Sequence, residues 1–209
     1  MCYVPQYIRI INVLSGIVGC KANVLEIDLS EKDLRSAASG DTEMVSFEAK
    51  FSTFGELDDA QKAQVSALET ILEKYITLDD FELATTDMGF EVIIEGEIPL
   101  TSNPNENSAY YLLVSPSTVM ADYKLVQFHT GGDFDKMATE MQAINFMLAP
   151  DAYHPTTFKL KADALNIIAT AVEKDGDAHL LWQGNIDGRE RFKFAGGVYD
   201  NIGAGLYFK

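Results

Sequence analysis

Cysteine is almost absent from this chain. Both cysteines, Cys2 and Cys20, lie within the first twenty of its 209 residues, and none follows. A fold held together by disulfides is therefore excluded, and so is a zinc site built on thiolates. A folded body without thiols suits an oxidising compartment.

Positive charge is also scarce. The chain has 16 Lys and Arg against 32 Asp and Glu, a formal net charge of −16. Nucleic-acid affinity comes mainly from Lys and Arg side chains that displace counterions, so this balance excludes nucleic acid as a partner. The plain consequence of such acidity is solubility. The hydrophobic fraction, 47%, is ordinary for a globular protein.

The spacings typical of catalytic and metal sites are missing. His129, His154 and His179 do not form a His-x-x-x-His pair, and the chain has neither a phosphate-binding glycine loop nor a Gly-x-Ser-x-Gly elbow. The segment Thr130–Asp135 comes nearest to a calcium loop but lacks its oxygen spacing, and Asp133 is expected to cap a helix. The sequence therefore predicts no enzymatic activity, no metal and no cofactor.

The first nineteen residues differ in character from the rest. The segment contains no acid, and its only charged side chain is Arg9, which is followed by the apolar run Ile10–Val18. A charged start, an apolar stretch of about 7–15 residues and a small residue before a cleavage point define a secretory signal. The run is shorter than the roughly 20 residues that span a bilayer. A signal peptide is therefore predicted at residues 1–19.

The residues Ile17-Val18-Gly19-Cys20 resemble the lipobox of bacterial lipoproteins. This resemblance implies cleavage before Cys20 and attachment of lipid to its thiol and to the new amino group. Three acyl chains hold a protein firmly, whereas one alone gives marginal binding. Lys21 resembles the outer-membrane class, because an Asp at that position tends to retain Gram-negative lipoproteins at the inner membrane. The expected location is the outer membrane of the cell envelope, facing the periplasm or the surface.

A second interpretation of the same segment stays open. Residues 1–19 would then be a buried first strand or helix, and Cys20 an ordinary core cysteine. The protein would be a soluble intracellular binding or assembly domain with no enzymatic activity. A central buried strand at Ile8–Val18 would refute both the signal and the anchor.

The remainder of the chain is rich in strands. Apolar and polar residues alternate, as strands with one wet face require. Tight turns at Thr86–Gly89, Asp175-Gly176 and Asp187-Gly188 indicate antiparallel pairing. We therefore expect an α+β fold with mainly antiparallel sheet and about three helices. The predicted strands are 24–29, 45–52, 81–84, 90–98, 109–114, 124–129, 156–161, 165–172, 178–183 and 189–194.

Three segments have helical character. Ser30 and Gly40 are placed to cap the two ends of the first. The second runs from Glu56 to Ile76, and the third spans Asp133–Leu148. The apolar stripe of the second helix is expected to face a sheet, and it consists of Leu57, Ala60, Gln64, Leu68, Ile71, Leu72 and Tyr75.

An asparagine-rich loop, Thr101–Ser108, is a candidate boundary between two lobes. The N-terminal α+β lobe would cover residues 20–100 and the C-terminal α+β lobe residues 109–209. The glycine-rich tail, 196–209, is expected to form a last edge strand or to dock loosely.

Exposed loops and tyrosines are the candidate contacts for a partner. Loops tolerate change while a scaffold holds them, and tyrosine is frequent in recognition surfaces. The candidates beside the loop and in the tail are Asn103, Asn105, Asn107, Tyr110, Tyr111, Tyr199 and Tyr207.

The segment Leu25–Leu100 resembles small uncharacterised lipoproteins of bacterial and prophage genomes, with Glu-Ile-Asp-Leu-Ser-Glu-Lys-Asp-Leu at Glu26–Leu34 carrying the likeness. The resemblance implies a location in the cell envelope, and we predict a lipid-anchored protein that binds another envelope protein. It also implies a phage-related role, such as modification of a surface receptor or superinfection exclusion. An intracellular binding domain and an enzyme with an unfamiliar site are the alternatives.

Overall fold

The computed structural model describes residues 22–209 except 106, 146–147, 149 and 195–198. The predicted signal peptide, the lipid-attachment residue Cys20 and the sorting residue Lys21 lie outside the described residues. Within them, the chain forms a nine-stranded sheet, three helices of nine to fourteen residues and a four-residue helix, α4 (Tyr199–Ile202). The α+β class with a dominant, mainly antiparallel sheet is confirmed at this level.

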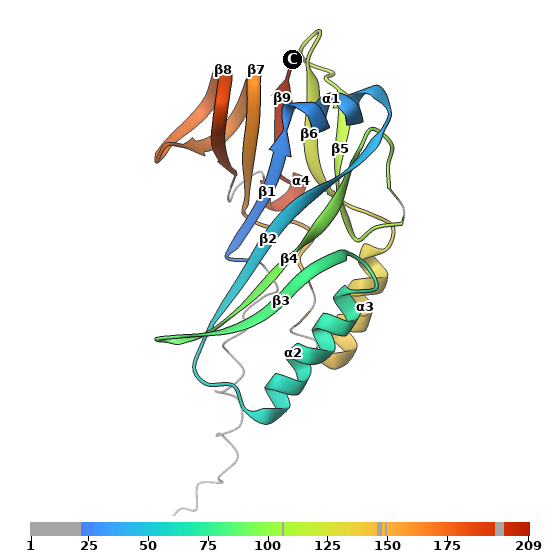
Figure 1. Cartoon of the computed structure of the whole chain (residues 1–209), viewed down its shortest axis with the longest axis vertical. Helices are drawn as coiled ribbons and strands as arrows, with labels where there is room; N and C mark the ends of the chain where they lie inside the picture. The colour runs from blue at the N-terminus through green and yellow to red at the C-terminus, as the bar shows by residue number, and fades with distance from the viewer. Residues whose placement is uncertain (1–21, 106, 146–147, 149, 195–198) are drawn as a thin grey trace, which may run out of the picture.

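The sheet closes into a seven-stranded barrel, which the sequence did not predict. Its strands follow one another around the ring, and β7 pairs with β1 to complete it (Figure 1). Closure removes the free edges of these strands. The pairings β1–β7 and β4–β5 are parallel, and the others are antiparallel. In ring order the strands are β1 (Val24–Ser30), β2 (Thr42–Phe54), β4 (Gly89–Thr101), β5 (Tyr110–Pro116), β6 (Lys124–Thr130), β9 (Gly205–Phe208) and β7 (Thr156–Lys174).

Two strands lie outside this ring, β3 (Thr77–Thr86) beside β4 and β8 (Asp177–Phe194) beside β7. The sheet does not divide at the Thr101–Ser108 loop. Strands β4 and β5, which flank this loop, pair with each other, and β1 pairs with the distant β7. A single cluster of buried side chains draws on both halves of the chain.

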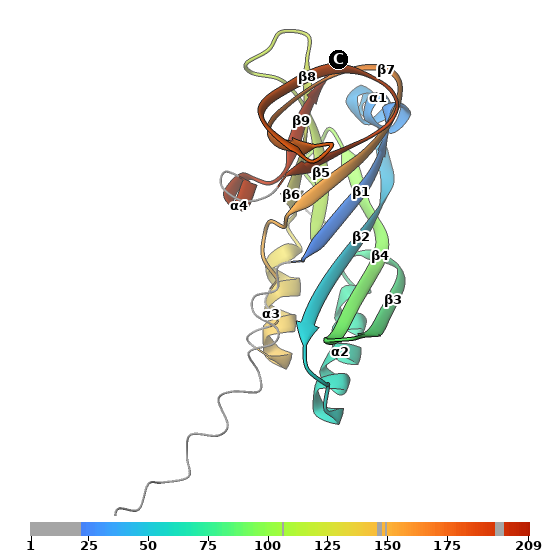
Figure 2. The same ribbon diagram turned by 90° about the vertical axis from the view of Figure 1, so that its left-hand side faces the viewer.

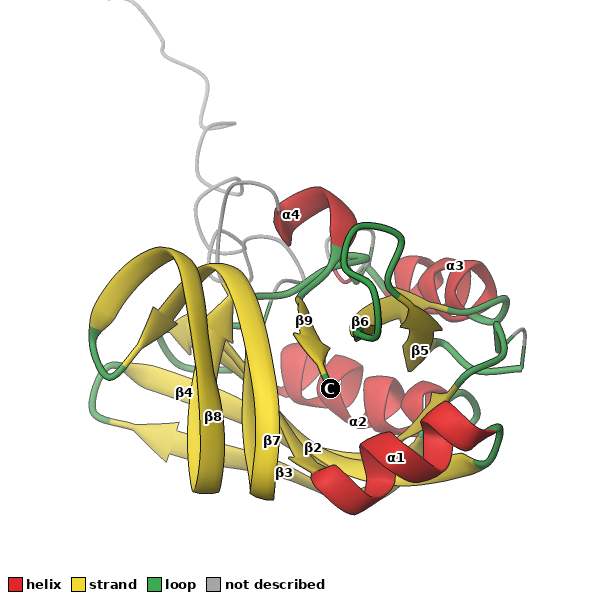
Figure 3. Ribbon diagram, turned by 90° about the horizontal axis from the view of Figure 1, so that it is seen from above, coloured by secondary structure: helices red, strands yellow, loops and turns green. Residues whose placement is uncertain are grey.

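The first helix forms where the sequence places it. In α1 (Glu31–Ser39), Ser30 Oγ accepts a hydrogen bond from the Asp33 amide at 3.1 Å, and Gly40 ends the helix with φ of 111°. Leu34 and Ala37 are fully buried against strands on several sides of the ring. Helix α1 therefore covers the upper end of the barrel in Figure 1, the end from which Figure 3 views the molecule.

The second helix, α2 (Asp59–Leu72), is shorter than predicted. Asp58 and Gln61 form a capping box that fixes its start, and the residues after Leu72 turn toward β3. Ile71 and Leu72 are buried and Leu68 is half-buried, as the predicted stripe requires. Ala60 is exposed and Val65 is buried, so the stripe is rotated from the predicted one.

The β3–β4 hairpin is confirmed, but β4 does not end at Pro99. The strand continues to Thr101, and Pro99 lies opposite Met44 of β2. Strand β3 begins at Thr77, opposite Glu97, so no β3 residue pairs with Pro99. The missing amide hydrogen of Pro99 therefore costs no bond to β3.

The third helix, α3 (Phe134–Ile144), is also shorter than predicted, and Asn145 takes extended backbone. Asp133 does not cap it. The Asp133 backbone is helical and its side chain makes no capping bond; its carboxylate binds Lys136 Nζ at 2.6 Å instead.

Four predicted strands are in fact two long ones, β7 and β8. Asp175-Gly176 forms the predicted turn between them, with φ of 55° and 87°. Asp187-Gly188 is not a turn. Gly188, with φ of 112°, lies within β8 opposite Ala162, where the β7–β8 register shifts, so its positive φ serves a bulge. The tail is not an edge strand either, because β9 lies between β6 and β7.

The far part of the β7–β8 hairpin curls over itself, as Figure 2 shows. Lys174 is buried inside the curl, where its Nζ lies 2.5 Å from Asp175 Oδ2, 2.8 Å from Glu190 Oε2 and 5.5 Å from the centre of the Trp182 ring. The hydrogen bonds to Asp175 and then Glu190 raise the pKa of Lys174. The buried charge is thus paired, as burial requires.

Candidate apolar binding chamber

The barrel wall is incomplete on one side. Strand β4 pairs with β5 only through Leu100 and Thr101, so the rest of β4 diverges from the short strands β5 and β6. Helices α2 and α3 contact each other and lie beside the lower half of the long strands (Figure 1). They form the wall that the short strands leave open.

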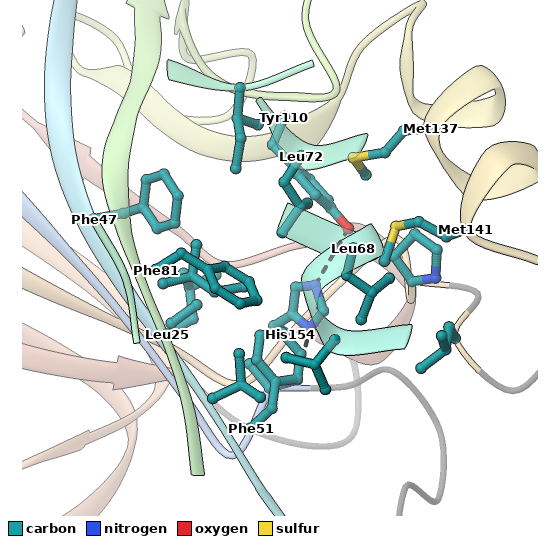
Figure 4. Close-up of a pocket in the computed structure, with 18 of the residues that line it drawn as sticks. Leu25, Phe47, Phe51, Leu68, Leu72, Phe81, Tyr110, Met137, Met141 and His154 are labelled. Atoms are coloured by element: carbon teal, nitrogen blue, oxygen red, sulfur yellow. Dashed lines mark hydrogen bonds between the residues drawn. The ribbon is translucent and has the colours of Figure 1, made fainter. Parts of the chain in front are cut away.

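A cavity of about 140 Å³ lies between this helix pair and the sheet. No Asp, Glu, Lys or Arg is among the residues that line it. Figure 4 shows side chains from both walls converging on it, among them Phe47, Phe81, Leu68, Met137 and Met141. Engineered apolar cavities of about 150 Å³ stay dry and admit benzene. This apolar chamber is therefore large enough for a slender hydrocarbon group.

The sheet side of the chamber follows from strand alternation. Phe47, Ala49 and Phe51 of β2 point to one face, and Val92 and Ile94 of β4 join them. Ala49 is the smallest side chain in this run, and it leaves space between two phenylalanines. Its substitution is therefore the direct way to fill the chamber.

The helix side is built from few residues. Among the α2 and α3 residues, Val65, Leu72, Met137 and Met141 are buried and line the chamber, and Leu68 lines it while half-buried. Methionine is unbranched and adapts to irregular space. The helix wall can therefore adjust to an occupant.

A polar network lies at one edge of the chamber. The Ala22 amide donates to His154 Nδ1 at 3.0 Å, which places the ring proton on Nε2. Nε2 lies 3.3 Å from Tyr110 Oη, and Tyr110 Oη donates to the Asp151 carbonyl at 2.7 Å. Tyr110 also stacks on Phe128 with ring centres 5.3 Å apart. The polar atoms of His154 and Tyr110 already form hydrogen bonds within the protein. These two residues therefore contribute mainly their ring faces to the chamber.

A cluster of three side chains joins α3 to the end of α2. Glu140 accepts from Lys74 Nζ and from Tyr75 Oη, each at 2.7 Å. These bonds, Lys74 first, lower the pKa of Glu140, and the bond to Glu140 raises the pKa of Tyr75. We call these three residues the helix clasp, because they connect the two helices that cover the chamber.

The predicted contact residues of the asparagine-rich loop lie on the surface. Asn103 and Asn107 are exposed and Asn105 is half-buried. The Asn105 side chain accepts a hydrogen bond from the Asn107 amide at 3.0 Å, an arrangement that shapes the loop.

The predicted tyrosines lie elsewhere. Tyr111 and Tyr199 are buried, and burial raises the pKa of both. Tyr111 stacks on His129, and the hydroxyl of Tyr199 lies 3.2 Å from Thr170 Oγ1. Tyr207 is half-buried in β9, and Tyr110 lines the chamber. The structure does not bring these residues together at one surface.

Sequence reasoning did not identify the chamber. Leu68 was expected only on the stripe that faces a sheet, and the predicted third helix, which carries Met137 and Met141, was assigned no functional role. The local signal is weak: Ala49 interrupts a run of large side chains, and two methionines recur one turn apart on α3.

Within the part of the chain that the structure describes, no helix has both the length and the apolar character needed to cross a bilayer. The same residues contain no group of three or more His, Cys, Asp or Glu arranged to hold a metal ion. No protein-family model matches the chain, and no curated protein matches it. The chamber and the N-terminal motif are therefore the two features of the chain that bear on its function.

Proposed function

We propose that this is a lipid-anchored protein of the cell envelope that binds an uncharged hydrocarbon group in the apolar chamber. The observation that carries the proposal is the empty apolar volume of about 140 Å³. The side chains that face this volume lack packing partners on that side. An apolar occupant restores those contacts, so occupancy stabilises the fold.

The lining defines the class of ligand. A carboxylate placed among these side chains would be desolvated without a cation to pair with it. A hydrocarbon group has no charge to desolvate, so it does not pay this cost. We therefore expect a ligand whose apolar part enters the chamber while any charged head group stays in water.

The lipobox-like residues Ile17–Cys20 support the envelope location, and Lys21 supports sorting to the outer membrane. An envelope protein partner and a phage-related role, through receptor modification or superinfection exclusion, rest on the resemblance of the sequence alone. The alternative of a soluble intracellular binding domain would keep the chamber and lose the anchor.

Binding is tested with the uncharged fluorescent dye Nile red. The full chain carrying Cys20→Ser, which takes no lipid, should enhance the fluorescence of the dye in a saturable way. Adding Ala49→Leu should weaken dye binding at least several-fold, because the new side chain fills the chamber. Val119→Leu adds a methylene at an exposed position, 72% accessible, and should leave binding unchanged. Equal dye binding by a folded Ala49→Leu protein would refute the chamber as the site.

Anchoring is tested by feeding bacteria a labelled fatty acid. The label should enter the wild-type protein, disappear in Cys20→Ser and persist in Cys2→Ser. Absence of label from the wild type, or its persistence in Cys20→Ser, would contradict the anchor.

A further inference from the structure

The described chain begins at the wall of the chamber. Ala22 is 2% exposed and lines the cavity. Its amide is held by His154 Nδ1, and the next amide, that of Asn23, donates to the Lys50 carbonyl at 2.8 Å. Hydrogen bonds to β2 and to His154 therefore fix the point at which the N-terminal segment meets the chamber.

Cys20 is only two residues before this point. At about 3.6 Å per residue, two residues of chain span at most about 7 Å. A lipid attached to Cys20 is therefore joined to Ala22 by only a short length of chain. An acyl chain is long enough to cross that distance and enter.

We propose that part of one acyl chain of the lipid on Cys20 occupies the chamber of its own protein. This inference rests on the proposed function, because it requires both the anchor and a chamber that accepts hydrocarbon. It goes beyond that function in naming the occupant.

The chemistry of the lining favours an acyl chain over a peptide segment such as Ile10–Val18. A peptide would bring backbone N–H and C=O groups into a lining in which only Ser52, Tyr110 and His154 carry polar side chains. Unpaired amides in such a place are costly. An acyl chain carries no such groups.

Attachment to the same chain also favours this occupant over a free lipid. A tethered group acts at an effective concentration on the order of millimolar, so a free ligand of the same intrinsic affinity displaces it only at a higher concentration than that. A tighter ligand from outside would displace the acyl chain and return it to the membrane. The chamber would then couple ligand binding to the number of acyl chains that hold the protein at the membrane.

The experiment uses a fatty acid with a photoreactive diazirine, incorporated by living cells into the full-length lipoprotein. Irradiation of washed membranes should cross-link the acyl chain to peptides from α2 and α3 of the same molecule. Ala49→Leu should reduce this cross-link several-fold while the label on Cys20 stays constant, and Val119→Leu should leave it unchanged. A second filling variant, Leu68→Phe, should act like Ala49→Leu.

Cross-links confined to membrane lipids or to residues outside the chamber would overturn self-occupancy, as would a cross-link that both filling variants leave intact. The Nile red titration of the Cys20→Ser chain separates the two proposals. Dye binding without the internal cross-link means that the chamber binds ligands but not its own lipid. Absence of both results refutes the chamber function together with the inference.

Discussion

The two ends of the barrel use the same kinds of side chain with different results. At the end covered by α1, Leu34, Leu112 and Leu160 are 0–1% exposed and do not line the chamber. At the other end, Phe47, Leu68 and their neighbours surround an empty volume of about 140 Å³. Composition therefore does not decide which end is filled.

The difference lies in what holds the walls. Around the packed end, hydrogen-bonded strands stand about 4.8 Å apart, so their inner side chains meet. Around the chamber, α2 and α3 are separate elements that the helix clasp joins to each other. A helix wall can stand further from a sheet, and the space it leaves becomes a binding site. This contrast can be tested by measuring the free energy of unfolding of variants at each end.

The largest effect is expected at the packed end. Leu160→Ala should lower the free energy of unfolding by about 2–5 kcal/mol, because a fully buried leucine loses its contacts and leaves a new void. Urea denaturation measures the change. A loss below about 1 kcal/mol would mean that this end is as loosely packed as the other.

The next largest difference is expected when a larger side chain replaces an alanine at each end. Ala37→Leu, in fully buried α1 packing, should cost about 1–3 kcal/mol through overpacking. Ala49→Leu introduces the same side chain into the chamber wall, and it should cost less than about 0.5 kcal/mol or stabilise the protein. Equal costs in urea denaturation would show that the chamber cannot accept the extra atoms.

A smaller loss is expected at the half-buried chamber residue Leu68. Leu68→Ala should cost about 1 kcal/mol, since one side of this leucine already faces empty space and has few contacts to lose. The measurement is again urea denaturation, with Leu160→Ala as the matched packed leucine. A cost equal to that of Leu160→Ala would contradict the contrast between the ends.

The smallest effect is expected from the helix clasp, because the side chains of Lys74 and Glu140 are 52% and 40% exposed. Because the folded-state pKa of Glu140 is lowered, its contribution is fully present above the unfolded pKa of about 4.5 and is lost as pH falls through the folded value. Glu140→Gln should lower the melting temperature slightly at pH 7, and the difference should shrink in acid. Glu73→Gln, an exposed change at the end of α2, is the control. If the difference in melting temperature between wild type and Glu140→Gln grew as the pH fell, the lowered pKa of Glu140 would be contradicted.

Local features were predictable and distant pairings were not. Helix α1 was predicted because Ser30, Asp33 and Gly40 decide its ends within a few residues. The chamber depends on how far α2 and α3 stand from β2, a distance that no local pattern encodes. The closure of the ring depends on partners such as Leu25 and Thr156, which lie far apart in the chain.

Two identical dipeptides show why one of the predicted turns was wrong. Asp175-Gly176 and Asp187-Gly188 carry the same turn signal, and both glycines have positive φ. The first joins two strands, whereas the second lies opposite Ala162 in a continuous ladder. Conformational preference fixes the backbone angle of such a glycine, and tertiary pairing decides whether that angle makes a turn or a bulge.

The parallel pairing of β1 with β7 has a consequence for the order of folding. Its residues are separated by most of the chain, as Leu25 opposite Thr156 shows, and β9, which ends at Phe208, must also enter the ring. Contacts this distant form slowly, because the long loop must close before any of them can form. The ring can therefore close only after β1, β7 and β9 have all been synthesised.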